Sequence, residues 1–328
     1  MPSHRRIIRS LGWNKISVAI SLLIFFVAAS TLYHVFRNIQ FGKVFAAIAA
    51  QSEQEILSAA GFVVAGYVFL TFYDVFALRT IGKNNVPFLV AAFASFTSST
   101  IGHALGAATV TGGIVRLRIY SGFGLSAVDI AKIAVITGIT FWLGNALVLG
   151  GAMSFAAEAA SMVDHLPSWI NRSIGLAALS AIACYLIWLI PRRRALGHRQ
   201  WRIVLPNARF TLVQIAIGAA ELTLVALAMY SLLPPSPKVA FPTVLVIFLT
   251  ATLLGTISHA PGSLGIMEAA MLIGLPQFQK EELLATLLTF RILYFVIPLF
   301  VATIALGLRE LRLVARRVTT RDHSRQTL

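Results

Sequence analysis

The chain has 328 residues and a formal net charge of +15, and 58% of its residues are hydrophobic while only 12% are charged. A soluble domain carries about 25% charged residues, so this composition predicts a protein that spans lipid. The single cysteine, Cys184, excludes an internal disulfide and a cysteine-based zinc site. The basic residues gather beside the ends of apolar segments, which is typical of membrane topology and argues against nucleic acid as a partner.

Seven apolar segments are long enough to cross the hydrocarbon core, which takes about 20 helical residues. They cover residues 16–36, 56–78, 128–152, 173–190, 210–232, 239–257 and 284–308. Two further apolar stretches, 87–113 and 264–273, are interrupted by polar residues, glycine or proline. The sequence therefore predicts an all-α, polytopic helical membrane bundle of about seven to nine segments, some of them re-entrant or broken.

Short basic tails, residues 1–15 and 309–328, flank a transmembrane domain that covers residues 16–308, and an arginine cluster follows residue 191. Basic residues beside helix ends lie on the cytoplasmic side, so both termini are expected in the cytoplasm. This charge pattern is best satisfied if residues 87–113 enter the membrane and leave it again on the same side. In the second half, residues 264–273 are then expected to form a short fourth crossing.

One short motif occurs in both halves of the chain. "TIGHALG" (residues 100–106) and "TISHAPG" (residues 256–262) agree in five of seven positions. Interrupted helices at matching positions mark the binding site in many transporters. We therefore expect an internal repeat with halves near 16–152 and 173–308. Chance similarity between apolar segments is the alternative.

The polar residues of these motifs and their neighbours form the candidate site. His103 and His259 either stiffen the helix breaks by hydrogen bonding or contact a lipid headgroup. Ser263 is expected to cap the short helix that carries Glu268, and the amides at this helix start suit a phosphate. Arg291, about two turns into an apolar segment, either extends to the membrane interface or binds an inward partner, Glu268 or a lipid phosphate.

Arg116 and Arg118 follow two glycines and have two readings, as cavity residues or as side chains that extend to the membrane interface. The residues expected to support the cavity are Asp74, Gly112, Gly113, Gly262 and Tyr294.

The remaining charges are expected to pair locally. Asp74 lies five residues from Arg79 and is expected to pair with it, and Asp129 is expected to pair with Lys132 one turn on. Glu221, in the middle of an apolar segment, has no partner that the sequence identifies.

Four segments together resemble a known family. They are "YDVFALRTIG", "IGHALGAATVTGGIVRLRIYSGFGLSAVDIAKI", "TFWLGN", and "SHAPGSLGIMEAAM" followed by "LLTFRILYFVIPL". This region, about residues 12–312, is similar to the membrane region of the lysylphosphatidylglycerol synthase/flippase family, the flippase domain of the multiple peptide resistance factor. Leu117, Ser263 and Met267 depart from the family pattern. No soluble aminoacyl-transfer domain follows the last apolar segment, so enzymatic activity is not expected.

The resemblance implies a bacterial inner-membrane protein that moves a phospholipid or lipid-like molecule between leaflets. Its expected partners are membrane phospholipids or other amphipathic lipids, with no cofactor, metal or catalytic residue, and an oligomer is compatible with the sequence. One alternative is a non-transporting partner or regulator of a separately encoded lipid-synthesising enzyme. Another is an intramembrane enzyme that uses the two histidines and Glu268. No ATP-binding motif is visible, so movement is passive or is driven by an ion gradient or another protein.

Overall fold

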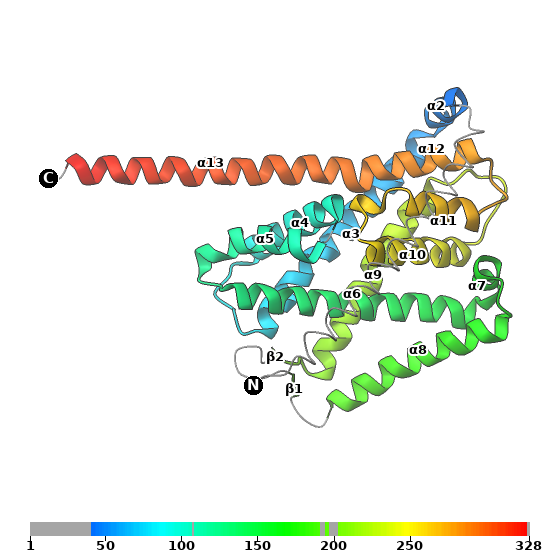
Figure 1. Cartoon of the computed structure of the whole chain (residues 1–328), viewed down its shortest axis with the longest axis horizontal. Coiled ribbons are helices and arrows are strands. Elements are labelled where there is room, and N and C mark those ends of the chain that lie inside the picture. Colours follow the sequence, from blue (N-terminus) through cyan, green and yellow to red (C-terminus); the bar gives the residue numbers. More distant parts are fainter. Residues whose placement is uncertain (1–40, 107, 191–193, 197–202, 327–328) are drawn as a thin grey trace, which may run out of the picture.

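A computed structural model describes residues 41–106, 108–190, 194–196 and 203–326. The expected first span (residues 16–36), the N-terminal tail (1–15) and most of the arginine cluster after residue 191 lie outside the described residues. The described chain is an all-α bundle, which confirms the predicted fold class, and α13 continues through most of the predicted C-terminal tail (Figure 1).

The elements follow one another as short and long helices with one small strand pair. The helices are α2 (Phe41–Ala50), α3 (Glu53–Thr80), α4 (Phe88–Leu105), α5 (Ala108–Tyr120), α6 (Ala127–Phe155), α7 (Ala157–Asp164), α8 (Ser168–Leu189), α9 (Ala208–Ser231), α10 (Phe241–Ser258), α11 (Ile266–Gly274), α12 (Lys280–Arg291) and α13 (Ile297–Gln326). Between them lie the 3-10 turns η1 (Ser121–Phe123) and η3 (Pro261–Ser263) and the π-helical segment η4 (Ile292–Val296). Strands β1 (Ala195–Leu196) and β2 (Ile203–Val204) pair antiparallel.

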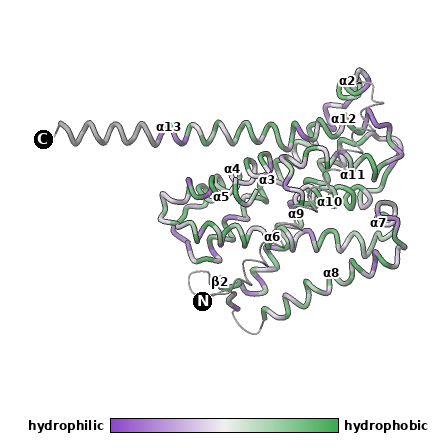
Figure 2. The backbone as a smooth tube through the Cα atoms, in the orientation of Figure 1, coloured by the Kyte–Doolittle hydropathy of each residue, from purple (hydrophilic) through white to green (hydrophobic). Residues whose placement is uncertain are grey.

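Seven helical segments within the described chain are long and apolar enough to cross a membrane. Six of them correspond to the predicted spans from residue 56 onward, and the last is formed jointly by α12, η4 and the first half of α13. The seventh is α4, which belongs to the interrupted stretch 87–113. Figure 2 shows the hydrophobic residues along the helices of the bundle and the hydrophilic ones gathered mainly at the connections.

Capping residues fix where the long helices begin. Ser52 and Glu55 form a reciprocal capping box at the start of α3, and Ser126 and Asp129 do the same for α6. Asp129 also forms an ion pair with Lys83 at 3.3 Å. The expected Asp129–Lys132 pair is therefore wrong, because the carboxylate turns back to cap its own helix and meets the loop before α4.

The two ends of the bundle differ in the charged residues that predominate there, although each end carries both signs. At one end, called the basic end, α3 finishes and α6 starts; its basic residues are Arg79, Lys83, Arg118, Arg309 and Arg312. At the opposite, acidic end α3 and α12 start; its acidic residues are Glu53, Glu55, Glu158, Asp164, Glu281 and Glu282. Hydrogen bonds from Thr286 to Leu232 and from Thr289 to Gln51 hold the acidic end together.

Helices α4 and α5 form a hairpin that enters and leaves at the basic end (Figure 1). Gly112 lets the two helices approach closely, because a Cβ there would lie 2.8 Å from the carbonyl oxygen of Ser98. The two open ends also meet, since the Asn85 side-chain amide donates to the carbonyl of Phe123 at 3.3 Å. This geometry agrees with the re-entrant reading of residues 87–113.

Helices α10 and α11 form a second hairpin, which opens toward the acidic end. Gly255 in α10 lies against Ser263, and a Cβ on Gly274 at the end of α11 would lie 2.7 Å from the side chain of Ile247. Helix α11 therefore returns along α10. The expectation that residues 264–273 form a separate fourth crossing is wrong, because the break at His259–Gly265 reverses the chain. The two hairpins enter from opposite ends, as an inverted repeat requires.

The through-going helices α3, α6 and α9 pack around small residues. A Cβ on Gly218 would lie 2.8 Å from the carbonyl of Thr140, and one on Gly144 would lie 2.7 Å from the Gly218 backbone. Close approach at small residues is the usual way membrane helices gain packing energy, because lipid supplies no hydrophobic drive between them. These three helices form the frame into which the two hairpins insert.

Candidate functional site

A cavity lies where the two hairpin ends meet the frame. It has a volume of about 270 Å³ and receives side chains from α3, α4, α5, α6, α9, α10, η3 and η4. Its lining residues Leu70 on α3, Phe141 on α6, Glu221 on α9 and Tyr294 on η4 fall near the middle of each span. The cavity therefore lies about halfway along the apolar spans, the level at which transporters with broken helices bind substrate.

The tips of the hairpins touch each other beside this cavity. A Cβ on Gly106 would lie 2.7 Å from the carbonyl oxygen of His259 and 3.1 Å from the nitrogen of Pro261. Gly106 also has φ 76° and ψ 175°, a conformation that is essentially restricted to glycine. The glycine that ends "TIGHALG" is thus required both for the turn and for contact with "TISHAPG".

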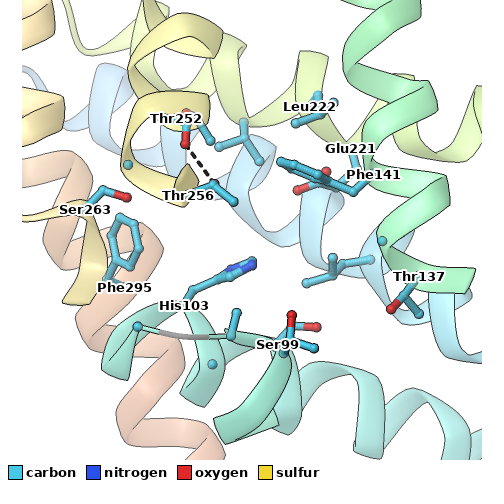
Figure 3. A pocket seen from close by; sticks show the side chains of 18 of the residues that line it. Ser99, His103, Thr137, Phe141, Glu221, Leu222, Thr252, Thr256, Ser263 and Phe295 are labelled. Carbon is cyan, nitrogen blue, oxygen red and sulfur yellow. Dashed lines mark hydrogen bonds between the residues drawn. The ribbon is translucent and has the colours of Figure 1, made fainter. Parts of the chain in front are cut away.

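Both repeated histidines line the cavity. His103 lies in the last turn of α4, and its ring points into the space between the hairpins (Figure 3). His259 ends α10 in the left-handed region with φ 55°, and Pro261, which cannot continue a helix, follows two residues later. The repeated motif therefore brings two imidazoles from opposite hairpins to one polar space.

A buried ion pair anchors the first hairpin to α3. Arg116 donates from Nε to Asp74 Oδ1 and Oδ2 at 3.1 and 3.0 Å and from Nη2 to Oδ1 at 2.8 Å. The Tyr120 hydroxyl donates to Oδ2 at 2.8 Å. The expected pair of Asp74 with Arg79 is wrong, because Asp74 faces the bundle interior and is fully buried. Arg116 lines the cavity, and its Nη1 donates to no described residue.

A second buried pair anchors the other hairpin. Arg291 pairs with Glu268, and its Nη1 and Nη2 donate to the carbonyls of Gly262 and Ser263 at 2.8 and 3.3 Å. Neither Arg291 nor Glu268 lines the cavity, so their expected place in its lining is wrong. Of the two partners predicted for Arg291, the structure shows Glu268.

Ser263 does not cap α11. The helix begins at Ile266 with Gly265 as its N-cap, and Glu268 Oε2 accepts from the Gly265 amide at 2.8 Å. The expectation that Ser263 would be the cap is wrong, because Gly265, with φ 80°, supplies the turn that Ser263 would have to make two residues too early. Glu268 thus takes one of the amides at this helix start, the Gly265 amide. Ser263 instead lines the cavity.

Of the remaining predicted residues, only some line the cavity. Arg118 points away from the cavity and pairs with Glu310 at 2.5 Å, with 62% of its side chain exposed. Its expected place in the cavity is wrong, because residues two apart on a helix face about 200° apart and Arg116 takes the inward direction. Tyr294 lines the cavity, Gly112 packs on α4, and Gly113 meets nothing within 4 Å.

Sequence reasoning missed most of the hydroxyl lining and left Glu221 unassigned. Glu221 is 5% exposed, lines the cavity and accepts a hydrogen bond from Tyr73 at 3.4 Å. The unpredicted hydroxyl residues of the lining are Tyr73, Ser98, Ser99, Thr109, Thr137, Thr252 and Thr256. These residues could have been predicted from the sequence as polar side chains within otherwise apolar spans, which usually face the interior of the bundle.

The cavity combines apolar walls with many hydroxyl groups and few free charges. Phe141, Trp142 and Phe248 supply apolar surface beside the hydroxyl residues. In the described part of the chain, no three His, Cys, Asp or Glu side chains gather as a metal site would require. Such a lining can replace the hydration of a small polar group through hydrogen bonds while its apolar part stays against the aromatic side chains.

No protein-family model matches the chain. The chain is 28% identical over 307 residues to the uncharacterized protein slr0712 of Synechocystis sp., which covers 92% of this chain and 94% of that protein. It is 30% identical over 300 residues to the inner membrane protein YbhN of Escherichia coli, which covers 88% of this chain and 90% of YbhN. The chain belongs to the YbhN family. Together with its seven apolar helices, this membership supports a multi-pass inner membrane protein.

A more distant relative bears on the resemblance noted from the motifs. The phosphatidylglycerol lysyltransferase of Staphylococcus haemolyticus is 22% identical over 290 residues, a match that covers 86% of this chain but 32% of that protein. The YbhN-like chain thus corresponds to one part of a longer protein. Neither YbhN nor slr0712 carries the name of an enzymatic activity.

Proposed function

We propose that this YbhN-family protein moves an amphipathic lipid between the leaflets of the inner membrane, with the polar headgroup passing through the cavity. The observation that carries the proposal is the meeting of two broken hairpins, from opposite ends of the bundle, at one hydroxyl-rich cavity. Irregular backbone at membrane depth is tolerated only where protein or a wet cavity surrounds it. A headgroup path is the use that fits such a costly arrangement best.

The cavity size supports passage of a headgroup rather than a whole lipid. Its volume of about 270 Å³ lies below the range of about 300–1,000 Å³ that is common for sites enclosing complete small molecules. The acyl chains would therefore stay in the surrounding lipid. A headgroup in hydrocarbon without hydrogen-bond partners costs several kcal/mol, and the serine, threonine and histidine side chains offset that cost.

Arg116 and His103 are the side chains proposed to receive a phosphate. Arg116 keeps Nη1 free of described partners while Asp74 fixes its other two nitrogens. Arginine held in this way presents a fixed donor to phosphate oxygens. His103 and His259 face the same space from the two hairpins and supply further donors. Arg291, Glu268 and Arg118 are assigned no contact with cargo.

Two glycines of α6 allow a matched test. Gly138 lines the cavity and Gly151 does not, and a Cβ on either would meet nothing within 4 Å. In liposomes that contain only this protein and a fluorescent phospholipid, we expect Gly138→Trp to slow lipid movement by about tenfold or more, because the indole fills the headgroup path. Gly151→Trp should retain the wild-type rate.

The same experiment distinguishes the alternatives. Equal lipid movement by Gly138→Trp and wild type would reject the cavity as the path. No movement by wild type alone, with movement or a new product only when a lipid-synthesising enzyme is added, would reject transport by this chain in favour of a partner or regulator. A covalently changed lipid in the protein-only liposomes would instead indicate an intramembrane enzyme.

A further inference from the structure

Three carboxylates lie buried near the middle of the bundle, and only two of them have a cationic partner. Asp74 is paired with Arg116, and Glu268 is paired with Arg291. Glu221 has no described lysine, arginine or histidine within ion-pair distance, and its hydrogen bond from Tyr73 is long, at 3.4 Å. An ionised carboxylate at membrane depth costs about 2.5–3.5 kcal/mol on insertion scales, so an unpaired one points to a ligand.

The groups that surround Glu221 offer it no replacement cation. From α3 and η4, Tyr67, Tyr73 and Tyr294 lie within electrostatic range of it. The cavity residues beside it on α6 and α10 are aromatic or carry hydroxyl groups, as Phe141, Thr137, Phe248 and Thr252 do.

The other titratable and charged groups that face the cavity come from the two hairpins. They are His103 of α4, His259 at the end of α10, and Arg116 of α5. Arg116 is already bound to Asp74, and Arg291 behind η4 is bound to Glu268 and to two carbonyls. Figure 3 shows Glu221 and the His103 ring directed into the same space from opposite walls.

We propose that Glu221 is a proton-binding site open to the cavity, and that proton binding there is coupled to occupation of the cavity by an anionic headgroup. This inference rests on the proposed function and adds its energy source. The carboxylate takes a proton from cavity water at one face and returns it to water at the other, so no covalent bond to cargo forms. A metal ion fits less well, because hard cations take about six or more oxygen ligands and among the described residues only the Tyr73 hydroxyl lies within hydrogen-bond distance of the Glu221 carboxylate.

The sign of the coupling follows from charge. With Glu221 ionised, the cavity carries an uncompensated negative charge that repels a phosphate in a medium of low dielectric constant. With Glu221 protonated, that repulsion disappears and the carboxyl group becomes a hydrogen-bond donor. Proton and anionic headgroup therefore favour each other's binding, and each must raise the affinity for the other by the same factor. The two move in the same direction across the membrane.

The test uses the full protein in liposomes with an imposed pH gradient. We expect a gradient that is acidic on the loading side to accelerate movement of an anionic fluorescent phospholipid by roughly 5- to 150-fold, the usual range for coupled sites. In Glu221→Gln, whose amide keeps the shape and can still accept from Tyr73, the ratio of the rates with and without the gradient should fall to about one, whatever the rate without a gradient. A trapped pH dye should report proton entry with wild type only.

Separate outcomes identify separate failures. Acceleration by the pH gradient that is equal in wild type and Glu221→Gln would overturn the proton site while leaving transport intact. If a sodium gradient accelerates lipid movement and a pH gradient does not, Glu221 binds a metal cation and the proposed proton site is wrong. No lipid movement under any condition would contradict the proposed function.

Proton binding itself is measured without transport. On acidification, the infrared spectrum of wild type minus that of Glu221→Gln should show one additional band of a protonated carboxyl group, because the other carboxyl groups are common to both proteins and cancel. Its absence from this difference spectrum would overturn the proton site regardless of lipid movement. If Glu221→Gln fails to fold, Tyr73→Phe serves instead, because loss of the neighbouring donor should displace the pH at which the band appears. An unchanged pH would overturn the assignment to Glu221.

Discussion

The buried pair between Asp74 and Arg116 makes the sharpest prediction about stability. Asp74 is fully buried and Arg116 is 6% exposed, and three guanidinium contacts and one phenol contact reach the carboxylate. Replacing either partner alone leaves an uncompensated charge in a dry setting, which costs about 3–5 kcal/mol. We therefore expect Arg116→Leu to lower the free energy of unfolding by about that amount.

Removing both charges together should lower the free energy of unfolding by much less than the sum of the two single substitutions. Asp74→Leu with Arg116→Leu leaves no buried ion, and the remaining cost is the unpaired Tyr120 hydroxyl, about 1–3 kcal/mol, plus imperfect packing. The coupling energy in the double-mutant cycle should therefore be at least about 3 kcal/mol. Adding Tyr120→Phe should recover part of what the double mutant loses.

Arg118 provides the matched control, since it is an arginine on the same helix with 62% of its side chain exposed and a partner in Glu310. An exposed pair is worth about 0–1 kcal/mol, so Arg118→Leu should be nearly neutral. The assay is equilibrium unfolding of the purified protein in mixed detergent micelles, followed by circular dichroism. Equal destabilisation by the Arg116 and Arg118 substitutions, or additive effects in the double mutant, would refute the reasoning.

Two further predictions concern the hairpins. Gly106→Ala should destabilise the protein by about 1–3 kcal/mol of backbone strain, plus the clash with His259, and so lower the thermal midpoint measured in detergent. Gly113→Ala should leave that midpoint unchanged or raise it. A lower midpoint for Gly113→Ala than for Gly106→Ala would contradict the contact between the hairpin tips. In a variant without Cys184, single cysteines that replace Lys83 or Arg118 should react with a membrane-impermeant reagent from the same side of the membrane, predicted to be the cytoplasmic side. A cysteine that replaces Glu158 should react from the opposite side. Labelling of positions 83 and 118 from opposite sides would rule out the re-entrant hairpin.

The spans could be predicted from the sequence because each is a continuous apolar run that lipid requires to be helical. The two breaks were also visible, because glycine, proline and histidine interrupt apolar sequence at residues 100–106 and 256–262. The apolar segments do not show in which direction the chain continues after an interrupted helix. Whether α11 crosses onward or returns depends on the left-handed turns at His259, Gly262 and Gly265, which only the folded chain shows.

Charge partners were predicted poorly because local spacing is a weak guide inside a bundle. Asp74 binds Arg116, 42 residues away, and Tyr73 reaches Glu221, 148 residues away. Arg79 does not pair with Asp74 because the fully buried carboxylate must be compensated from inside the bundle, by Arg116. Lys132 does not pair with Asp129 because that carboxylate turns back to cap its own helix and meets Lys83. Helical geometry alone, by contrast, forbade Arg116 and Arg118 from facing one cavity, since they lie two residues apart.

Each of the two hairpins is held to a neighbouring helix by one buried ion pair. Arg116 of the first hairpin is held by Asp74 on a through-going helix, and Glu268 of the second is held by Arg291 at the end of α12. The first pair fixes α5 to the frame away from the hairpin tip, whereas Arg291 fixes the second hairpin at its tip to α12, through Glu268 and the carbonyls of Gly262 and Ser263. Breaking either would expose a bare charge at a cost of several kcal/mol, whereas separating the tips breaks only van der Waals contacts around Gly106. Opening of the cavity should therefore occur by parting of the tips, with both pairs intact. Glu221, which holds no hairpin, is the buried carboxylate whose charge can change without loosening that frame.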